Sequence, residues 1–149
     1  MADRDPTHAS DDADRRETLE RLILDTTILV QAERKSAALD ELIDDDDDVA
    51  IAAVTAAELL VGAELADRRR RRQREQFVNE LLTTIPVEDY DLDVAHAHAG
   101  LLAHTRRSGR PRGAHDLIIA ATAVASDRIV VTADTAGFDD LPGVSVRSA

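Results

Sequence analysis

The stretch LILDTTILV, residues 22–30, is an apolar run with a single carboxylate near its middle. Short runs of Leu, Ile and Val are typical of strands that are buried on both faces of a parallel sheet. Burying a charge without a partner is expensive, so Asp25 has to mark the place where the buried strand ends. We therefore predict a strand over residues 21–25, followed by a helix that starts at Thr26 or Thr27 and continues to about residue 40.

The rest of the chain alternates between short apolar segments and segments with helical periodicity. This alternation is typical of an α/β sandwich with a mainly parallel sheet. Further strands are predicted at 49–54, 84–88, 127–134 and 143–146, and further helices at 55–66, 67–82, 91–107 and 115–125. The first 20 residues are polar and lack apolar periodicity, which predicts a disordered extension over 1–20 and one folded domain over 21–149.

Composition limits the class of protein and the chemistry available to it. With 149 residues the chain is long enough for one domain with a real core. Cysteine is absent, which excludes disulfides, thiolate metal sites and a cysteine nucleophile. No window approaches ~18 consecutive apolar residues, and the N-terminal stretch lacks an apolar secretory core. We therefore expect a cytoplasmic protein without a membrane span.

The net charge of -12 comes from 30 acidic and 18 basic residues, and Lys35 is the only lysine. Abundant Asp and Ala with almost no Lys resemble the composition of proteins from salt-loving organisms. High ionic strength screens repulsion between like charges, so such a negative charge costs less there. The acidic balance is therefore only weak evidence against a nucleic-acid partner.

Four carboxylates stand at similar places in the predicted fold. Asp25 and Asp134 close predicted strands, whereas Glu58 and Asp116 stand in the first turns of predicted helices. Ligands of open parallel sheets bind beyond the carboxyl ends of the strands, so we expect all four acids at one sheet edge. Each acid also has a purely structural interpretation, as a turn residue or as a favourable partner of a helix dipole. Thr55 and Glu58, for example, have the spacing of a capping box.

Carboxylates gathered within a few ångströms repel each other and raise their own pKa values. Mg2+ or Mn2+ relieves this repulsion, because hard divalent cations prefer oxygen ligands. Such a site is suited to the hydrolysis of phosphodiesters, since the metal activates a water and stabilises charge on the phosphate. We therefore predict that the Asp25 carboxylate is not buried but is directed toward a cation at the sheet edge.

Four segments in order resemble the motifs of the PIN-domain ribonucleases, specifically the VapC-type toxins of toxin–antitoxin pairs. LDTTILV resembles the opening strand and Asp-Thr segment of that family, and VTAAELLVG resembles its second motif, with Glu58 as the acid. HDLIIAATA is similar to the third motif, with Asp116 as its acid, and IVVTADTAGF followed by LPGVSV is similar to the last motif and terminal strand. The resemblance covers roughly residues 21–147.

The resemblance implies a PIN-like three-layer α/β/α sandwich around a central, mainly parallel sheet. It also implies a Mg2+- or Mn2+-dependent endoribonuclease that cleaves RNA, forms a homodimer and is held in check by a VapB-type antitoxin. The residues that would bind the metal and catalyse the reaction are Asp25, Glu58, Asp116 and Asp134, with supporting hydroxyl groups from Thr26, Thr27 and Thr132.

One position departs from the family pattern. Members of the family often carry an acid directly before the Phe of the last motif, and this chain has Gly137 there. The fourth acidic role would then belong to Asp134, or in part to Asp139 beyond the Phe. A non-catalytic PIN-like module that binds RNA or protein is the alternative function that this departure leaves open.

Arginines supply the positive charge that an RNA substrate would need. The run 68–72 with Arg74 could contact RNA phosphates or an antitoxin, or could be a solvated helix face paired with the acidic segment 44–48. A second group lies closer in sequence to Asp116. The candidates for RNA contact are Arg110, Arg112, Arg68 and Arg69. His115, beside Asp116, is expected at a helix cap or in solvent.

Overall fold

The first predicted strand becomes the centre of the fold. In the computed structural model, which describes residues 20–34 and 47–149, β1 (Arg21–Leu24) pairs with β2 (Asp48–Ala52) on one side and with β4 (Ile129–Thr132) on the other. The short strands β3 (Val87–Glu88) and β5 (Val146–Ser148) complete a five-stranded sheet of order β3-β2-β1-β4-β5. Every pairing in this sheet is parallel, so the predicted α/β class is confirmed.

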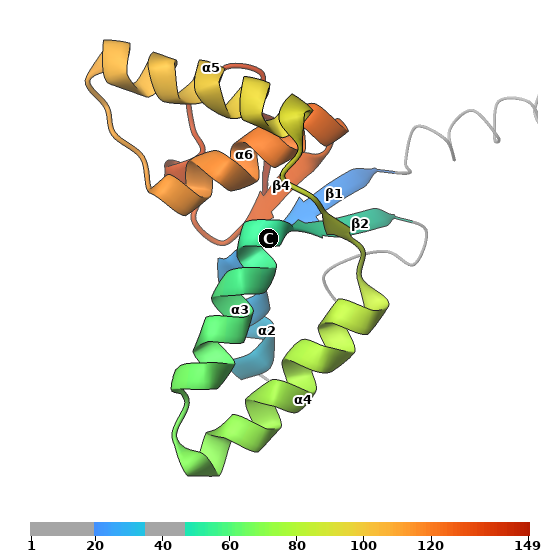
Figure 1. Ribbon diagram of the computed structural model, residues 1–149. Helices are drawn as coiled ribbons and strands as arrows, with labels where there is room; N and C mark the ends of the chain where they lie inside the picture. Colours follow the sequence, from blue (N-terminus) through green and yellow to red (C-terminus); the bar gives the residue numbers. More distant parts are fainter. Residues whose placement is uncertain (1–19, 35–46) are drawn as a thin grey trace, which may run out of the picture.

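Helices cover both faces of this sheet (Figure 1). One layer consists of α5 (Leu92–Ser108) and α6 (Ala114–Ser126). The other consists of α2 (Thr26–Arg34), α3 (Ala53–Leu65) and α4 (Arg68–Thr84), of which α3 and α4 form a long hairpin. The predicted three-layer α/β/α sandwich is therefore confirmed.

The core has two parts because successive side chains of a strand point to opposite faces of the sheet. Ile23 packs against apolar side chains of α5 and α6, whereas Leu22 and Leu24 pack against those of α2, α3 and α4. These three side chains are fully buried, and each such burial stabilises the fold by about 1.5–3 kcal/mol. The uninterrupted apolar sequence of β1 is thus explained by a layer of helices on each side.

Several element boundaries differ from the predictions, and three of them have a clear physical reason. α3 begins at Ala53 with no side-chain cap, so the predicted capping box is wrong: Thr55 lies inside the helix, where it is fully buried. β3 has two residues instead of five: α4 continues through Thr84, the first position assigned to the strand, and the pairing with β2 involves only Val87 and Glu88. β5 starts at Val146 rather than at 143, because Gly143 has a φ of +77° in the preceding turn.

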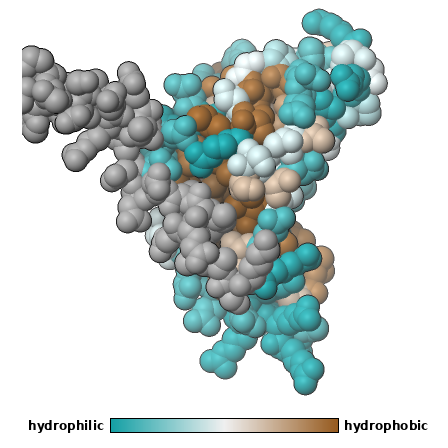
Figure 2. All heavy atoms as spheres, turned by 180° about the vertical axis from the view of Figure 1, so that it is seen from behind, coloured by the Kyte–Doolittle hydropathy of each residue, from teal (hydrophilic) through white to brown (hydrophobic). Residues whose placement is uncertain are grey.

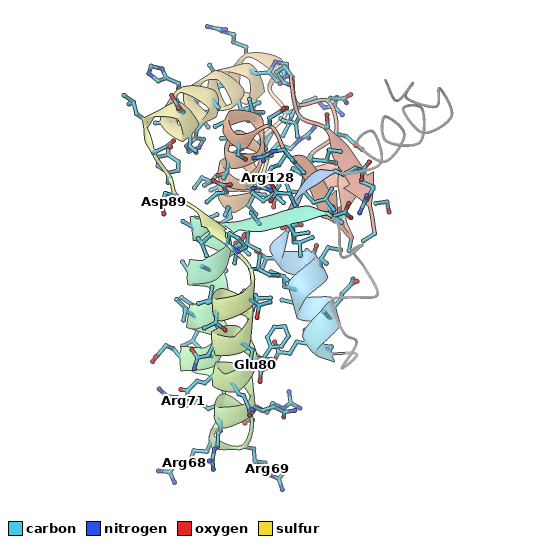
Figure 3. The ribbon with its side chains drawn as sticks, turned by 90° about the vertical axis from the view of Figure 1, so that its right-hand side faces the viewer. Arg68, Arg69, Arg71, Glu80, Asp89 and Arg128 are labelled. Carbon is cyan, nitrogen blue, oxygen red and sulfur yellow. The ribbon has the colours of Figure 1, made fainter. Side chains whose placement is uncertain are left out.

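A buried arginine joins the first four strands of the sheet. Arg128 directly precedes β4, and its Nη1 donates to the carbonyl oxygens of Leu22 at 3.2 Å and Asp48 at 2.9 Å, and to Asp48 Oδ1 at 3.0 Å. Its Nε and Nη2 donate to Glu88 Oε1 at 3.1 and 2.9 Å. The side chain is only 5% exposed, and Figure 3 shows it among the strands. Arg128 thus connects β4 to β1, β2 and β3.

Some predictions fall outside the described residues. The disordered extension predicted for 1–20 lies there except for residue 20, and so does the part of the first predicted helix from residue 35 to about residue 40. None of the described helices has both the length and the apolar character needed to cross a membrane.

Candidate active site

The carboxyl ends of the parallel strands bring the four predicted acids to one edge of the sheet. Asp25 directly follows β1, and Asp134 comes two residues after β4, the neighbour of β1. Glu58 lies in the second turn of α3, the helix that follows β2, and not in the first turn as predicted. Asp116 lies in the first turn of α6. Four acidic side chains that are far apart in the sequence thus lie at the same edge of the sheet.

Asp25 is held by two hydroxyl groups. Its Oδ2 accepts a hydrogen bond from Thr27 Oγ1 at 2.9 Å and another from Thr132 Oγ1 at 2.7 Å. The residue is only 3% exposed, so the prediction that this side chain would not be buried is wrong. The two hydroxyl donors replace water as partners of the carboxylate, which makes its burial tolerable.

Thr132 also connects Asp25 to Asp134. Its Oγ1 accepts a hydrogen bond from the backbone N–H of Asp134 at 3.0 Å, and the N–H of Ala133 donates to Thr27 Oγ1 at 3.3 Å. The segment after β4 is therefore bonded to the same two hydroxyl groups that hold Asp25. Two of the three predicted supporting threonines, Thr27 and Thr132, therefore contact the same acid, Asp25.

Thr26, the third predicted supporting residue, contacts a different acid. Its Oγ1 donates to Glu58 Oε1 at 3.2 Å. The same Oε1 lies 3.3 Å from Nδ1 of His115, which is 57% exposed at its side chain. His115 is thus partly in solvent, as expected, but it also reaches Glu58, a contact that no sequence pattern indicated.

The charges of the other three acids affect the pKa of Asp116. Burial is the largest effect that raises the pKa of its carboxyl above the ordinary value, and the charges of Asp25, Asp134 and Glu58 raise it further. The nearby His115 acts in the opposite direction. Asp134 is one of these charges, and its backbone N–H donates to Thr132, which also bonds to Asp25, so the structure associates Asp134 with the cluster.

The burial and the repulsion that raise the pKa of Asp116 predict a stabilising substitution. In EDTA at pH 7, Asp116→Asn is expected to raise the free energy of unfolding by less than about 1 kcal/mol, since the side chain is partly solvated. The folded chain binds this proton more tightly than the unfolded chain, so wild-type stability falls as the pH rises above the ordinary aspartate value of 3.8. The gain should therefore disappear near pH 3, where the wild-type carboxyl is protonated in both states.

Urea unfolding in EDTA at both pH values measures this effect. Asp93→Asn, at an exposed position in the first turn of α5, serves as the control for removing one negative charge. A gain for Asp116→Asn that is equal at both pH values would show that the ionised carboxyl of Asp116 is not its cause.

The chemistry of the donor set fits a hard divalent cation. Carboxylate oxygens are the ligands that Mg2+ and Mn2+ prefer, and a cation would relieve the repulsion at Asp116. Within the ranges 20–34 and 47–149, no three acidic or histidine side chains are arranged as a ready ligand set.

Two of the predicted RNA-contact arginines lie beside this edge. Arg110 and Arg112 are in the segment that leads into α6 and Asp116. Arg110 Nη1 lies 3.5 Å from Asp140 Oδ2, and Arg112 Nη2 donates to the carbonyl oxygen of Asp139. Arg112 Nε is buried, and the described residues offer it no hydrogen-bond partner. The two arginines thus join the segments that precede α6 and follow β4.

The other two candidates are remote from the acids. Arg68 and Arg69 lie at the end of α4 farthest from the sheet (Figure 3). Seen from behind, this end of the α3–α4 hairpin is mostly hydrophilic (Figure 2). Arg71 forms ion pairs with Glu64 of α3 and Glu75 of α4, so acids of the same hairpin pair with this arginine of the run. Of the acidic segment 44–48 predicted as an alternative partner, 44–46 lie outside the described residues, and Asp48 pairs with Arg21 and Arg128.

Comparison with known proteins gives one family. A model of the PIN domain matches residues 22–144 of the chain. The VapC ribonuclease Y4jK of Sinorhizobium fredii is 44% identical over 50 residues, which are 34% of this chain and 36% of that relative. This match therefore spans about a third of the relative's length.

Solved structures match over most of the chain. VapBC-5 from Mycobacterium tuberculosis, a member of the VapBC family of toxin-antitoxin systems, is 32% identical, with a TM-score of 0.72. The match covers 87% of this chain and 98% of that one. VapBC2 from Rickettsia felis, bound to a DNA fragment from its promoter, gives a TM-score of 0.78 at 23% identity, with the same coverage of both chains, and supports the fold.

Proposed function

The chain belongs to the PIN-domain family, and from this premise we propose that it is a metal-dependent endoribonuclease, the toxin of a VapBC-type toxin–antitoxin pair. The observation that carries the proposal is the position of Asp25, Glu58, Asp116 and Asp134 at the carboxyl edge of the parallel sheet, close enough for the charges of the other three to raise the pKa of Asp116. The relatives named as a VapC ribonuclease and as VapBC-5 support the class of reaction and of partner.

A bound Mg2+ or Mn2+ would supply charge stabilisation for the scissile phosphate and an activated water. The acids that would hold it are Asp25, Glu58, Asp116 and Asp134. Around them, Thr27 and Thr132 fix the Asp25 carboxylate, and Thr26 fixes that of Glu58. Such bonds orient the acids before substrate arrives, which lowers the cost of organising the site.

RNA cleavage by the purified chain tests the proposal. Because the composition resembles that of halophilic proteins, the assay is run at low and at high salt, with Mg2+, Mn2+ or EDTA. We expect cleavage of single-stranded RNA that requires a divalent cation and disappears in EDTA. Cleavage that continues in EDTA would contradict the metal-dependent mechanism.

A non-catalytic PIN-like binding module is the second candidate. The observation that favours it is Gly137, which stands directly before Phe138, where members of the family often carry an acid. This function predicts RNA binding without cleavage at any salt concentration, and binding that Mn2+ does not change. The same assay, combined with a filter-binding measurement, separates the two functions.

The proposed partners are a VapB-type antitoxin and a second copy of the chain. Three apolar side chains of α3 are solvent-exposed, namely Leu60 (45%), Val61 (53%) and Leu65 (81%). Exposed apolar side chains that lie together on one helix are typical of a protein interface. Light scattering of the chain alone, and again with the antitoxin, measures both associations.

The two pairs of arginines predict different kinetic effects. Removing two phosphate contacts to single-stranded RNA should lower the slope of log affinity against log salt by about 1.4. We expect this in the double variant Arg110→Ala/Arg112→Ala, together with a lower kcat, because these residues adjoin Asp116. Arg68→Ala/Arg69→Ala should raise KM with kcat unchanged. Arg21→Ala, at the opposite end of β1, is the control; an equal effect of all three variants would refute specific contacts.

A further inference from the structure

Two glycines bracket the carboxylate of Asp116. A Cβ placed on Gly137 would lie 2.9 Å from Asp116 Oδ2, and one placed on Gly113 would lie 3.1 Å from the same atom. Cβ atoms in real proteins essentially never show the shorter of these distances. The Asp116 carboxylate therefore occupies space that a side chain at either position would take.

Backbone conformation does not require glycine at these two positions. The glycines with positive φ among the described residues are Gly109 and Gly143. Gly113 has φ −56° and ψ 138°, which alanine readily adopts. What Gly113 and Gly137 provide is thus room, and the group that uses this room is the Asp116 side chain.

Of the atoms in this contact, those of the Asp116 side chain can move most easily. Gly137 ends the short 3-10 helix η2 (Thr135–Gly137), and the next residue, Phe138, is 1% exposed in the core. Because Phe138 anchors the backbone, a side chain at 137 would displace the carboxylate rather than the chain. Such a change would leave the fold intact and move one of the four acids.

We propose that Gly137 is a positioning residue that sets the place of the Asp116 carboxylate by leaving this volume free. The inference rests on the proposed function for its effect on cleavage, and on the contact geometry alone for its effect on the carboxylate. In this chain the Asp116 carboxylate occupies the space that a side chain at 137 would take, so a side chain there would change the place of that carboxylate whether or not it carries a charge.

The first test compares Gly137→Ala and Gly137→Asp with the wild-type chain by Mn2+ titration and RNA cleavage. Both variants should bind Mn2+ about 10- to 100-fold more weakly, the range seen when residues that orient metal ligands are changed. Cleavage at limiting Mn2+ should fall in parallel. The melting temperature in EDTA should change by less than about 3 °C. Gly137→Asp with tighter Mn2+ binding or faster cleavage would overturn the proposal.

The control and the rescue use other positions of the same chain. Gly100 lies in α5, and a Cβ placed on it would have nothing within 4 Å, so Gly100→Ala should leave Mn2+ affinity unchanged. In an Asp116→Ala background, Gly137→Ala should have no additional effect on Mn2+ affinity, because the displaced group is absent. An equal additional loss in both backgrounds would show a general structural role and overturn the proposal.

A crystal structure of Gly137→Ala in EDTA separates this inference from the proposed function. The Asp116 carboxylate should occupy a different side-chain torsion, with the backbone of residues 135–138 unmoved. An unmoved carboxylate beside the new Cβ would refute the inference even if the wild-type chain cleaves RNA. A wild-type chain that neither binds Mn2+ nor cleaves RNA would refute the proposed function, and the position of the carboxylate would still decide the inference.

Discussion

Asp25→Asn is expected to lower RNA cleavage by at least about a thousandfold, which corresponds to ~4 kcal/mol of activation free energy. The neutral amide keeps the shape of the side chain, so Thr27 and Thr132 can still bond to it. What is lost is the negative charge at the end of the central strand. A large loss of activity with an almost unchanged fold would identify that charge as part of the reaction.

The measurement is single-turnover cleavage with saturating Mn2+, accompanied by thermal unfolding. Asp127→Asn is the matched control, because Asp127 is exposed, precedes β4 at the other edge of the sheet, and has a left-handed φ of 55° that asparagine tolerates. The control should retain wild-type activity. If Asp25→Asn cleaves RNA as fast as the control does, the proposed mechanism is wrong.

Arg128→Leu is expected to destabilise the fold by about 3 kcal/mol and to lower the melting temperature by roughly 10 °C. The substitution removes the donors that bond to the carbonyl oxygens of Leu22 and Asp48 and to the carboxylate of Glu88, and the lost bond to Leu22 is a buried one. We take the lower end of the range for a broken buried ion pair, since the carboxylates of Asp48 and Glu88 are 48% and 33% exposed.

Arg21→Leu is the matched control for this effect. Arg21 also pairs with Asp48, at 2.8 Å, but both side chains are 48% exposed. An exposed pair of this kind contributes less than about 1 kcal/mol. Guanidinium denaturation of both variants measures the difference, and equal losses would mean that burial is not what makes Arg128 important.

The fold was predictable from the sequence because its signals are local. The apolar run of β1, the alternation of strand and helix, and the positions of the acids at strand ends can all be seen within short windows. Parallel pairing then brings the ends of β1, β2 and β4 to one edge without further information. That general rule was enough to propose the four acids together.

The parts that were missed depend on contacts between distant residues. The burial of Asp25 depends on Thr132, which lies 107 positions further along the chain. Arg128 reads as one more surface arginine until its partners, 40, 80 and 106 positions away, are known. From the sequence, Gly137 is only a position where an acid of the family motif is missing, because its closeness to Asp116 is visible only in three dimensions. Thr55 shows the opposite error, in which a local capping pattern was overruled by packing.

The strand order also means that the order in which the strands are synthesised differs from the order in which the sheet can be completed. β1 is the first strand of the chain, yet one of its two neighbours, β4, comes near the end. Until β4 is present, β1 has an unpaired edge and Asp25 lacks the hydroxyl of Thr132. A partly synthesised chain without β4 therefore lacks the hydrogen bond that positions the Asp25 carboxylate. The pairing of β1 with β4 is a long-range contact, which can form only late in folding.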